Sequence, residues 1–166
     1  MSVEQSLVLI KPDGLVKSIT GDIISKMSET GLKIVGSKVV QVTRELAEEH
    51  YQYLREEKFF DELIKYIMGE FHTKRVLALV YHGEGAIKSI RKIVGSTNPE
   101  KAEPTSVRGK YGRITSAGVF ENVIHASENL KEAEGEIKLW FRPDELVYTL
   151  YPTEIKKVTI DKVFWK

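Results

Sequence analysis

Four apolar segments, rich in valine, isoleucine and leucine, alternate along the chain with segments that have the apolar periodicity of helices. The four segments are residues 6–10, 32–42, 76–81 and 119–124. Short runs of β-branched and other apolar residues are typical of buried β-strands. Strands that alternate with helices indicate an α/β or α+β domain.

The expected helices follow these strands. They cover residues 21–28, 43–54, 59–68, 86–94 and 129–142. Thr43 is a suitable N-cap, and Asn129 begins the last helix with Glu132 at the capping-box position. Residues 12–14, Pro-Asp-Gly, predict a turn. This order of elements resembles a split β-α-β sandwich, although periodicity does not settle the order of the strands in the sheet.

The chain length and composition fit one ordinary globular domain. The 166 residues include no cysteine, which excludes a disulfide framework and a thiol nucleophile, and the net charge of +1 gives no sign of a nucleic-acid surface. The N-terminus lacks the basic segment of a signal peptide, and no apolar run reaches the roughly 18 residues of a membrane helix. We therefore expect a single cytoplasmic domain over residues 1–166, with residues 143–166 as a C-terminal tail, and neither a membrane nor a specific nucleic acid as partner.

Residues 95–118 have almost no apolar periodicity. Structureless segments longer than about 12–15 residues are usually functional or disordered in compact domains. This segment contains hydroxyl residues and the basic residues Lys101, Arg108, Lys110 and Arg113. Its composition therefore predicts an anion-binding loop.

One histidine lies between the fourth expected strand and the last helix. His125 is followed by the small residues Ala126 and Ser127, which leave room for a bulky group, and Glu136 on the next helix is suited to orient the ring. A histidine that is fixed by a carboxylate and faces an open space is suited to nucleophilic catalysis. The other histidines lack metal-ligand spacing and are interpreted as surface or packing residues: His50, His72 and His82.

Three cations on separate elements, Lys11, Arg91 and Arg108, suit the binding of a polyphosphate. The local sequence does not show that they converge. Residues 83–89 lack the lysine position of a Walker A loop, and neither a dinucleotide glycine motif nor the protein-kinase motifs occur. The residues alone therefore indicate an α/β enzyme with a phosphate-type ligand and a histidine nucleophile.

Five short motifs occur in order between residues 6 and 146: LVLIKPDG, GSTNP, SVRG, NVIHAS and EIKLWF. In this order and near this spacing they resemble the nucleoside diphosphate kinase family, for which N-x-x-H-[GA]-S is a specific signature. The resemblance implies a ferredoxin-like α+β sandwich, in which helices cover a four-stranded antiparallel sheet, with a long nucleotide-binding loop. It also implies transfer of the γ-phosphoryl group from a nucleoside triphosphate to a nucleoside diphosphate by a ping-pong mechanism.

The resemblance also implies roles for individual residues. His125 matches the histidine that takes the γ-phosphoryl group on its pros nitrogen, and Ser127 and Glu136 match the residues that hydrogen-bond near it. Tyr51 matches a tyrosine that supports the site, and Lys11 matches a lysine that contacts the phosphates. The full set implied to bind the nucleotide is Lys11, Phe59, Leu63, Arg91, Thr97, Arg108 and Asn122.

The implied cofactor is Mg²⁺, held mainly by the nucleotide phosphates and water, with no metal-ligating side chain from the protein. The implied partners are nucleoside di- and triphosphates, with Phe59 stacking on the base and Leu63 packing beside it, and further copies of the chain in a hexamer or tetramer built from dimers. Three features depart from the family pattern. Glu128 stands where the family usually has an aspartate. The chain is a few residues longer than the common pattern around residues 70–74 and 115–118, and the C-terminal tail has no clear match.

Two alternatives come from other functional classes. A non-catalytic nucleotide-binding regulator on the same fold would be expected to lack one of the matched catalytic or phosphate-binding residues, and all of them are present. A histidine phosphocarrier would pass its phosphoryl group to a protein, whereas Phe59 and the basic segment favour a nucleotide. An assay with a triphosphate donor and a different diphosphate acceptor distinguishes the three functions.

Overall fold

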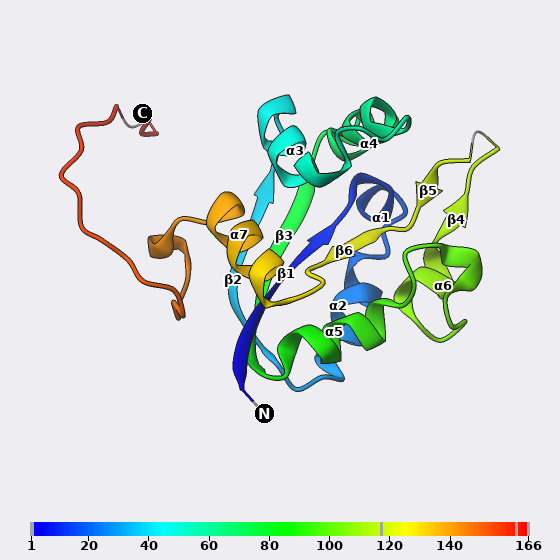
Figure 1. Ribbon diagram of the computed structural model, residues 1–166, viewed down its shortest axis with the longest axis horizontal. Coiled ribbons are helices and arrows are strands. Elements are labelled where there is room, and N and C mark those ends of the chain that lie inside the picture. The colour runs from blue at the N-terminus through cyan, green and yellow to red at the C-terminus, as the bar shows by residue number, and fades with distance from the viewer. Residues whose placement is uncertain (1, 117, 162, 166) are drawn as a thin grey trace.

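A four-stranded antiparallel sheet forms the centre of the computed structural model, which describes residues 2–116, 118–161 and 163–165 (Figure 1). The strands are β1 (Val3–Ile10), β2 (Lys33–Val40), β3 (Val76–Glu84) and β6 (Ile124–Ala126). Their order in the sheet is β2-β3-β1-β6, and every pair is antiparallel. This arrangement confirms the ferredoxin-like sandwich implied by the resemblance.

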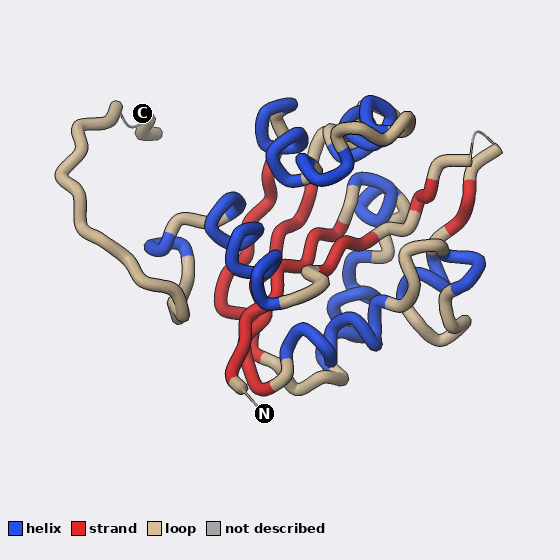
Figure 2. Tube along the Cα trace, viewed as in Figure 1, coloured by secondary structure: helices blue, strands red, loops and turns tan. Residues whose placement is uncertain are grey.

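Helices cover both faces of this sheet, as Figure 2 shows. The helices on one face are α3 (Arg44–His50), α4 (Phe60–Ile67) and α7 (Leu130–Trp140), and those on the other are α2 (Thr20–Ser28) and α5 (Ala86–Val94). Because successive strand residues point to opposite faces, Leu7 and Leu9 pack under the first group of helices, and Val8 and Ile10 pack under the second. Each fully buried aliphatic side chain contributes roughly 1.5–3 kcal/mol, so β1 is held firmly from both sides.

Two helical segments differ from the sequence expectation. The turn expected at residues 12–14 is the first part of a short helix, α1 (Pro12–Val16), which begins with the proline. Thr43 caps α3 as expected, because its hydroxyl accepts a hydrogen bond from the Leu46 N–H at 3.2 Å. That helix does not continue through residue 54, however, and is followed by a separate 3₁₀ helix, η1 (Gln52–Leu54).

The segment over residues 95–118 contains regular structure that the sequence analysis did not detect. It includes the 3₁₀ helix η2 (Pro99–Lys101) and the helix α6 (Val107–Tyr111), whose first turns are capped by the side chains of Asn98 and Ser106. Helices of this length are too short to produce a recognisable apolar period. The expected loop is therefore a pair of short capped helices joined by irregular segments.

The fourth strand of the sheet lies later in the chain than expected. The predicted strand over residues 119–124 is wrong, because part of it forms β5 (Phe120–Glu121), which pairs with β4 (Arg113–Ile114) in a separate hairpin. The break falls at Val123, whose φ of 57° is left-handed, and the Ile124 N–H donates to the Asn122 carbonyl oxygen at 2.7 Å. This is the hydrogen bond of a γ-turn. Residue 125 therefore lies inside β6 rather than after the strand.

The C-terminal tail leaves the domain after the 3₁₀ helix η3 (Pro143–Glu145). Its first residues stay attached, since the Val147 N–H donates to the Val35 carbonyl oxygen and the Gln5 side-chain amide donates to the Tyr148 carbonyl oxygen, both at 2.8 Å. Tyr151 still packs at the margin of the core. The described residues that follow it form neither helix nor strand and arc away from the domain (Figure 2). Over the described ranges, no helix has the length and apolar character needed to cross a membrane.

Candidate active site

His125 lies in the middle of β6, opposite Leu9 of β1. Its neighbours Ile124 and Ala126 belong to the core beneath α2 and α5. Because side chains alternate along a strand, the His125 ring points to the other face, where α3 and α7 pack. Its side chain is 12% exposed, so the ring is rigidly held and still partly open to solvent.

The carboxylate expected to orient this ring lies beside it. His125 Nε2 is 2.8 Å from Oε1 of Glu136 on α7, although the contact is too bent for a regular hydrogen bond. The second carboxylate oxygen, Oε2, accepts a 2.6 Å hydrogen bond from the Ser127 hydroxyl. That hydroxyl also accepts from the Leu7 N–H at 3.0 Å, which ties the pair to the central strand. With Nε2 turned toward Glu136, Nδ1 is the ring nitrogen left for chemistry.

The electrostatic surroundings keep the His125 ring neutral. Burial lowers its pKa well below the ordinary value of 6.5, and the cations Lys11, Arg108 and Arg91 lower the pKa further. A neutral imidazole keeps a lone pair on one nitrogen, which a nucleophile requires. The same three cations that would repel a proton from the ring would attract a phosphate group to it.

Lys11 stands at the end of β1 and is buried. Its Nζ donates to Oδ1 of Asn122 at 2.8 Å, and the Asn122 amide in turn donates to the Thr97 carbonyl oxygen at 2.9 Å. Burial lowers the pKa of Lys11 to about 7, with Arg108 acting in the same direction and Asp13 opposing them. An opposite charge raises the pKa of such a lysine, so an arriving phosphate would make it take up a proton.

Arg108 connects α6 to β6. Its Nη2 donates to the Ile124 carbonyl oxygen at 3.0 Å, and its Nη1 lies 3.4 Å from the Thr97 hydroxyl, to which it donates. Burial and the nearby Arg91 lower the pKa of Arg108 to about 10, which leaves it charged at neutral pH. The guanidinium is therefore a fixed positive charge next to the residue that precedes His125.

Arg91 approaches the same region from α5. Its Nη2 lies 3.5 Å from Oε1 of Glu128, and the two side chains are 37% and 65% exposed. Exposed pairs of this kind contribute little to stability, so a phosphate group can replace the carboxylate at small cost. The fold thus brings three cations from α5, α6 and the end of β1 close enough to His125 to lower its pKa, a convergence that the sequence alone did not show.

The turn before β6 is held by a residue that the sequence analysis did not single out. Asp13 is fully buried; its Oδ2 accepts from the Val123 N–H at 3.1 Å and its Oδ1 from the Tyr66 hydroxyl at 2.7 Å. Gly14 is required here, because a Cβ at this position would lie 2.9 Å from the Val123 carbonyl oxygen. A β-branched residue with left-handed φ costs roughly 1–3 kcal/mol, so these contacts must hold Val123 in place. The only sequence signal for this role was that Asp13 and Gly14 belong to the IKPDG motif.

The tyrosine expected to support the site lies at the end of α3, and the two residues expected at the nucleotide base lie at the start of α4 and within it. Tyr51 is buried at the end of α3 with its ring centroid 6.5 Å from that of His125, and its hydroxyl finds no hydrogen-bond partner among the described residues. Phe59, just before α4, is 53% exposed, and Leu63 packs at the margin of the core one turn later. An exposed aromatic ring beside a half-buried leucine offers a flat apolar surface.

His50, interpreted as a surface or packing residue, is buried with its ring centroid 4.6 Å from that of His125.

Comparison with protein families gives one match. The family model described as nucleoside diphosphate kinase matches residues 4–146. Among individual proteins, the nucleoside diphosphate kinase of Pyrococcus horikoshii is 46% identical over 144 residues, which cover 86% of this chain and 88% of that protein. The region matched by the family model contains every residue named in the site above and ends just after η3, within the first residues of the tail.

Solved structures give the same result. A halophilic nucleoside diphosphate kinase from Halobacterium salinarum in complex with CDP has a TM-score of 0.80 and 36% identity, and covers 89% of this chain and 93% of its own. A transition-state mimic of the nucleoside diphosphate kinase from Borrelia burgdorferi, with bound vanadate and ADP, has a TM-score of 0.79 and 31% identity, and covers 90% and 93%. The likeness therefore extends over the whole domain in both sequence and fold.

Proposed function

This chain belongs to the nucleoside diphosphate kinase family, and we propose that it transfers the γ-phosphoryl group of a nucleoside triphosphate to a nucleoside diphosphate by a ping-pong mechanism through a phosphohistidine at His125. One observation carries the proposal. The His125 ring has a strongly lowered pKa, its Nε2 faces Glu136 at 2.8 Å, and three cations lie close enough to lower that pKa. This is an arrangement for a nitrogen nucleophile that attacks a polyphosphate.

In the first half-reaction, the lone pair on His125 Nδ1 forms a bond to the γ-phosphorus. The bond between that phosphorus and the oxygen bridging to the β-phosphate breaks, and its electron pair leaves on the nucleoside diphosphate. The proton on Nε2 stays between the ring and Glu136, which stabilises the positive charge that the ring gains. A second nucleoside diphosphate then enters the same site, and its terminal oxygen takes the phosphoryl group back by the reverse displacement.

The cations act mainly through position and charge. Lys11, Arg91 and Arg108 neutralise the phosphates as charge moves from the ring nitrogen to the leaving diphosphate. Thr97 and Asn122 bind phosphate or ribose oxygens between them. Because Lys11 and Arg108 are already fixed by protein hydrogen bonds, little reorganisation is required when the substrate binds, and this saves entropy that a flexible site would lose.

We also propose that Mg²⁺ accompanies the nucleotide. The residues around the three cations fit a metal that is carried by the phosphates, because the buried carboxylates of the site already have partners: Asp13 accepts two internal hydrogen bonds, and Glu136 accepts one from Ser127 and faces His125. When bound to phosphate and water oxygens, Mg²⁺ would neutralise part of the substrate charge. The protein side chains would then hold the phosphates and not the metal.

Phe59 and Leu63 are proposed to hold the base. Stacking on an aromatic ring is worth roughly 1–3 kcal/mol per base and does not depend on which base is present. The two relatives above were solved with ADP and with CDP, a purine and a pyrimidine nucleotide, which supports broad use of nucleotides by this chain.

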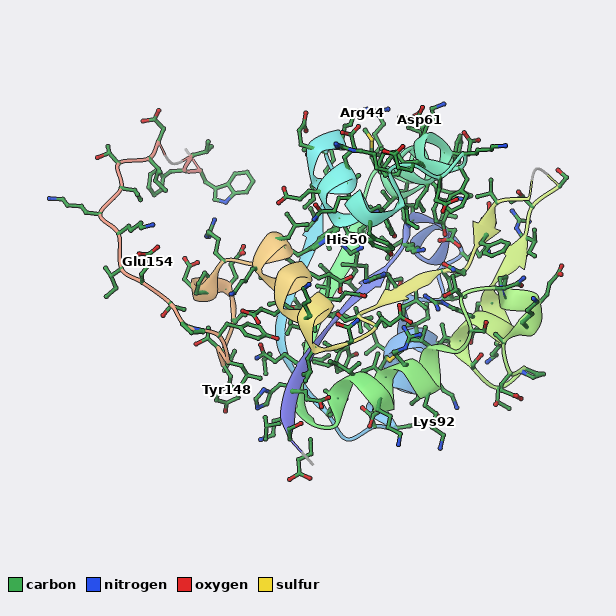
Figure 3. All side chains as sticks on the ribbon, viewed as in Figure 1. Arg44, His50, Asp61, Lys92, Tyr148 and Glu154 are labelled. Atoms are coloured by element: carbon green, nitrogen blue, oxygen red, sulfur yellow. The ribbon has the colours of Figure 1, made fainter. Side chains whose placement is uncertain are left out.

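Assembly and location are also proposals. We propose a homo-oligomer, a hexamer or a tetramer built from dimers, in which the tail over residues 143–166 of the single domain contacts a neighbouring copy. Ile155 and Trp165 in this tail are fully exposed in the isolated chain, and Figure 3 shows Glu154 far from the domain. The cytoplasm stays a prediction of the sequence.

The test is to mix the enzyme with γ-labelled triphosphate and to ask which residue becomes labelled. The label should be stable in alkali and labile in acid, it should move to added diphosphate, and His125→Ala should abolish it. Full labelling of His125→Ala would place the nucleophile elsewhere. A label that moves to a protein but not to diphosphate would favour a phosphocarrier, and nucleotide binding without any label would favour a regulator.

A further inference from the structure

His50 lies in the interior between α3 and α7 and is not assigned any role by the proposed mechanism (Figure 3). Its Nδ1 is 3.2 Å from Nε1 of Trp140, and both side chains are buried. An indole N–H only donates hydrogen bonds, so His50 Nδ1 must be the acceptor. The remaining proton of the neutral ring is therefore on Nε2.

The His50 Nε2–H is buried and has no hydrogen-bond partner among the described residues. Three side chains meet here, and one nitrogen or oxygen atom of each lies within 4.8 Å of the other two: His50, His125 and Glu136. The Glu136 carboxylate therefore lies near both imidazole rings and is an available acceptor for the His50 Nε2–H. Hydrogen bonds of catalytic groups are often long in free enzymes and shorten when the substrate binds.

A metal ion is the first alternative occupant, since two histidines and a carboxylate are a usual ligand set for zinc. The tautomer of His50 argues against it. A metal on Nε2 requires the proton to be on Nδ1, where it is normally donated to a carbonyl or carboxylate. Here Nδ1 faces the Trp140 N–H, so metal binding would set two donors against each other.

A purely structural role is the second alternative. Burial, with His125 acting in the same direction, lowers the pKa of His50 to about 3, so the ring is neutral and makes no ion pair with Glu136. The bond from Trp140 accounts for Nδ1, but a buried donor without an acceptor destabilises a protein, so a purely structural role leaves the Nε2–H unexplained. The polar ring therefore calls for a function.

We propose that His50 is a positioning residue for the phosphoryl transfer: Trp140 fixes its tautomer, and its Nε2–H closes onto the Glu136 carboxylate as His125 gains charge. Glu136 would then be held by three donors, the Ser127 hydroxyl and one N–H from each histidine. Burial raises the pKa of Glu136, and donors to its ionised form oppose that effect. His50 thereby keeps the carboxylate charged and aimed at His125 Nε2. This inference rests on the proposed function.

The experiment compares His50→Phe with His50→Gln. Both changes remove the Nδ1 acceptor of the Trp140 N–H, so this loss is matched. Phenylalanine also removes the donor, whereas the glutamine amide keeps an N–H near the position of Nε2. We expect His50→Phe to slow phosphohistidine formation by about 10- to 100-fold, the effect of losing one hydrogen bond to a charged group, while nucleotide affinity is unchanged. His50→Gln should recover most of the rate. In the wild-type enzyme, ¹H–¹⁵N correlation spectra should show His50 protonated on Nε2 alone.

Three results decide the question. If wild-type His125 is phosphorylated but His50→Phe reacts at the wild-type rate, the inference fails and the proposed function stands. If His50→Gln is as slow as His50→Phe while both bind nucleotide normally, the N–H donor is not what matters and the inference also fails. If wild-type His125 is never phosphorylated, the proposed function itself fails.

Discussion

Replacing Asp13 by alanine tests whether the turn at Val123 positions the nucleophile. The change leaves two buried donors without an acceptor, the Val123 N–H and the Tyr66 hydroxyl. Each costs roughly 1–3 kcal/mol, or about 4 kcal/mol together. Val123 then relaxes out of its left-handed conformation, which returns roughly 2 kcal/mol of strain. We therefore expect the free energy of unfolding to fall by about 2 kcal/mol.

The catalytic effect should be larger than the loss of stability suggests. Val123 lies two residues before His125, so relaxation of the turn shifts the start of β6, and a displacement of about 1 Å can lower a rate by roughly 100-fold. Tyr66→Phe is the matched control. It removes one donor to Asp13, keeps the ring that lies 5.2 Å from Lys11 Nζ, and leaves the bond between Asp13 and Val123. We expect it to cost roughly 1–3 kcal/mol as well, with the transfer rate nearly unchanged.

Urea denaturation measures the stability of each variant, and rapid-quench detection of phosphohistidine measures the transfer rate. The Asp13 charge raises the pKa of Lys11, so Asp13→Ala should lower that pKa below its value of about 7. The rates are therefore compared on the acid plateau of each variant's pH profile, where Lys11 is protonated. If Asp13→Ala and Tyr66→Phe transfer at the same rate when both are folded, the turn does not position His125 and the reasoning is refuted.

Three further predictions concern the ligand-binding residues. The Lys11 pKa of about 7 lies below the ordinary 10.5, so kcat/KM for the triphosphate should fall as pH rises through 7. Unfolding should take up a proton between pH 7 and 10.5, so this group makes the free energy of unfolding rise across that window. Lys11→Met should abolish both effects, and a wild-type kcat/KM that does not change with pH near 7 would mean that Lys11 stays charged in the free enzyme. Arg91→Ala and Arg108→Ala should each weaken triphosphates by roughly 1.5–3 kcal/mol more than nucleosides, as titration calorimetry can measure, and equal losses for both ligands would place these arginines outside the phosphate site. Purine diphosphates should be only modestly better acceptors than pyrimidine ones, and Phe59→Ala should reduce the difference; a preference above about a thousandfold, roughly 4 kcal/mol, would reveal a group that reads the base edge.

Local sequence was sufficient for most of the secondary structure. The first three strands were placed within a few residues, because runs of β-branched residues and helix-period segments are properties of neighbouring positions. The Thr43 cap is equally local, since the hydroxyl reaches an N–H only three residues away. The fourth strand was misplaced because Val119 to Ile124 have the composition of a single strand. The break at Val123 is held by contacts with residues far away in the sequence, such as Asp13, 110 positions away.

For the chemistry of the site, too, some properties follow from the sequence and others only from the tertiary structure. The sequence by itself determined the types of group available: a histidine suited to act as a nucleophile without competing cysteine, a carboxylate on the next helix, and cations on separate elements. The tertiary structure decided that Lys11 reaches Asn122, that Arg108 holds the carbonyl before His125, and that His50 faces the same carboxylate. The physical reason is that burial, tautomer and pKa depend on which segments pack together. Contacts between residues 16 to 111 positions apart leave no periodic trace in the sequence, so these properties arise only when the sheet and its two layers of helices have formed.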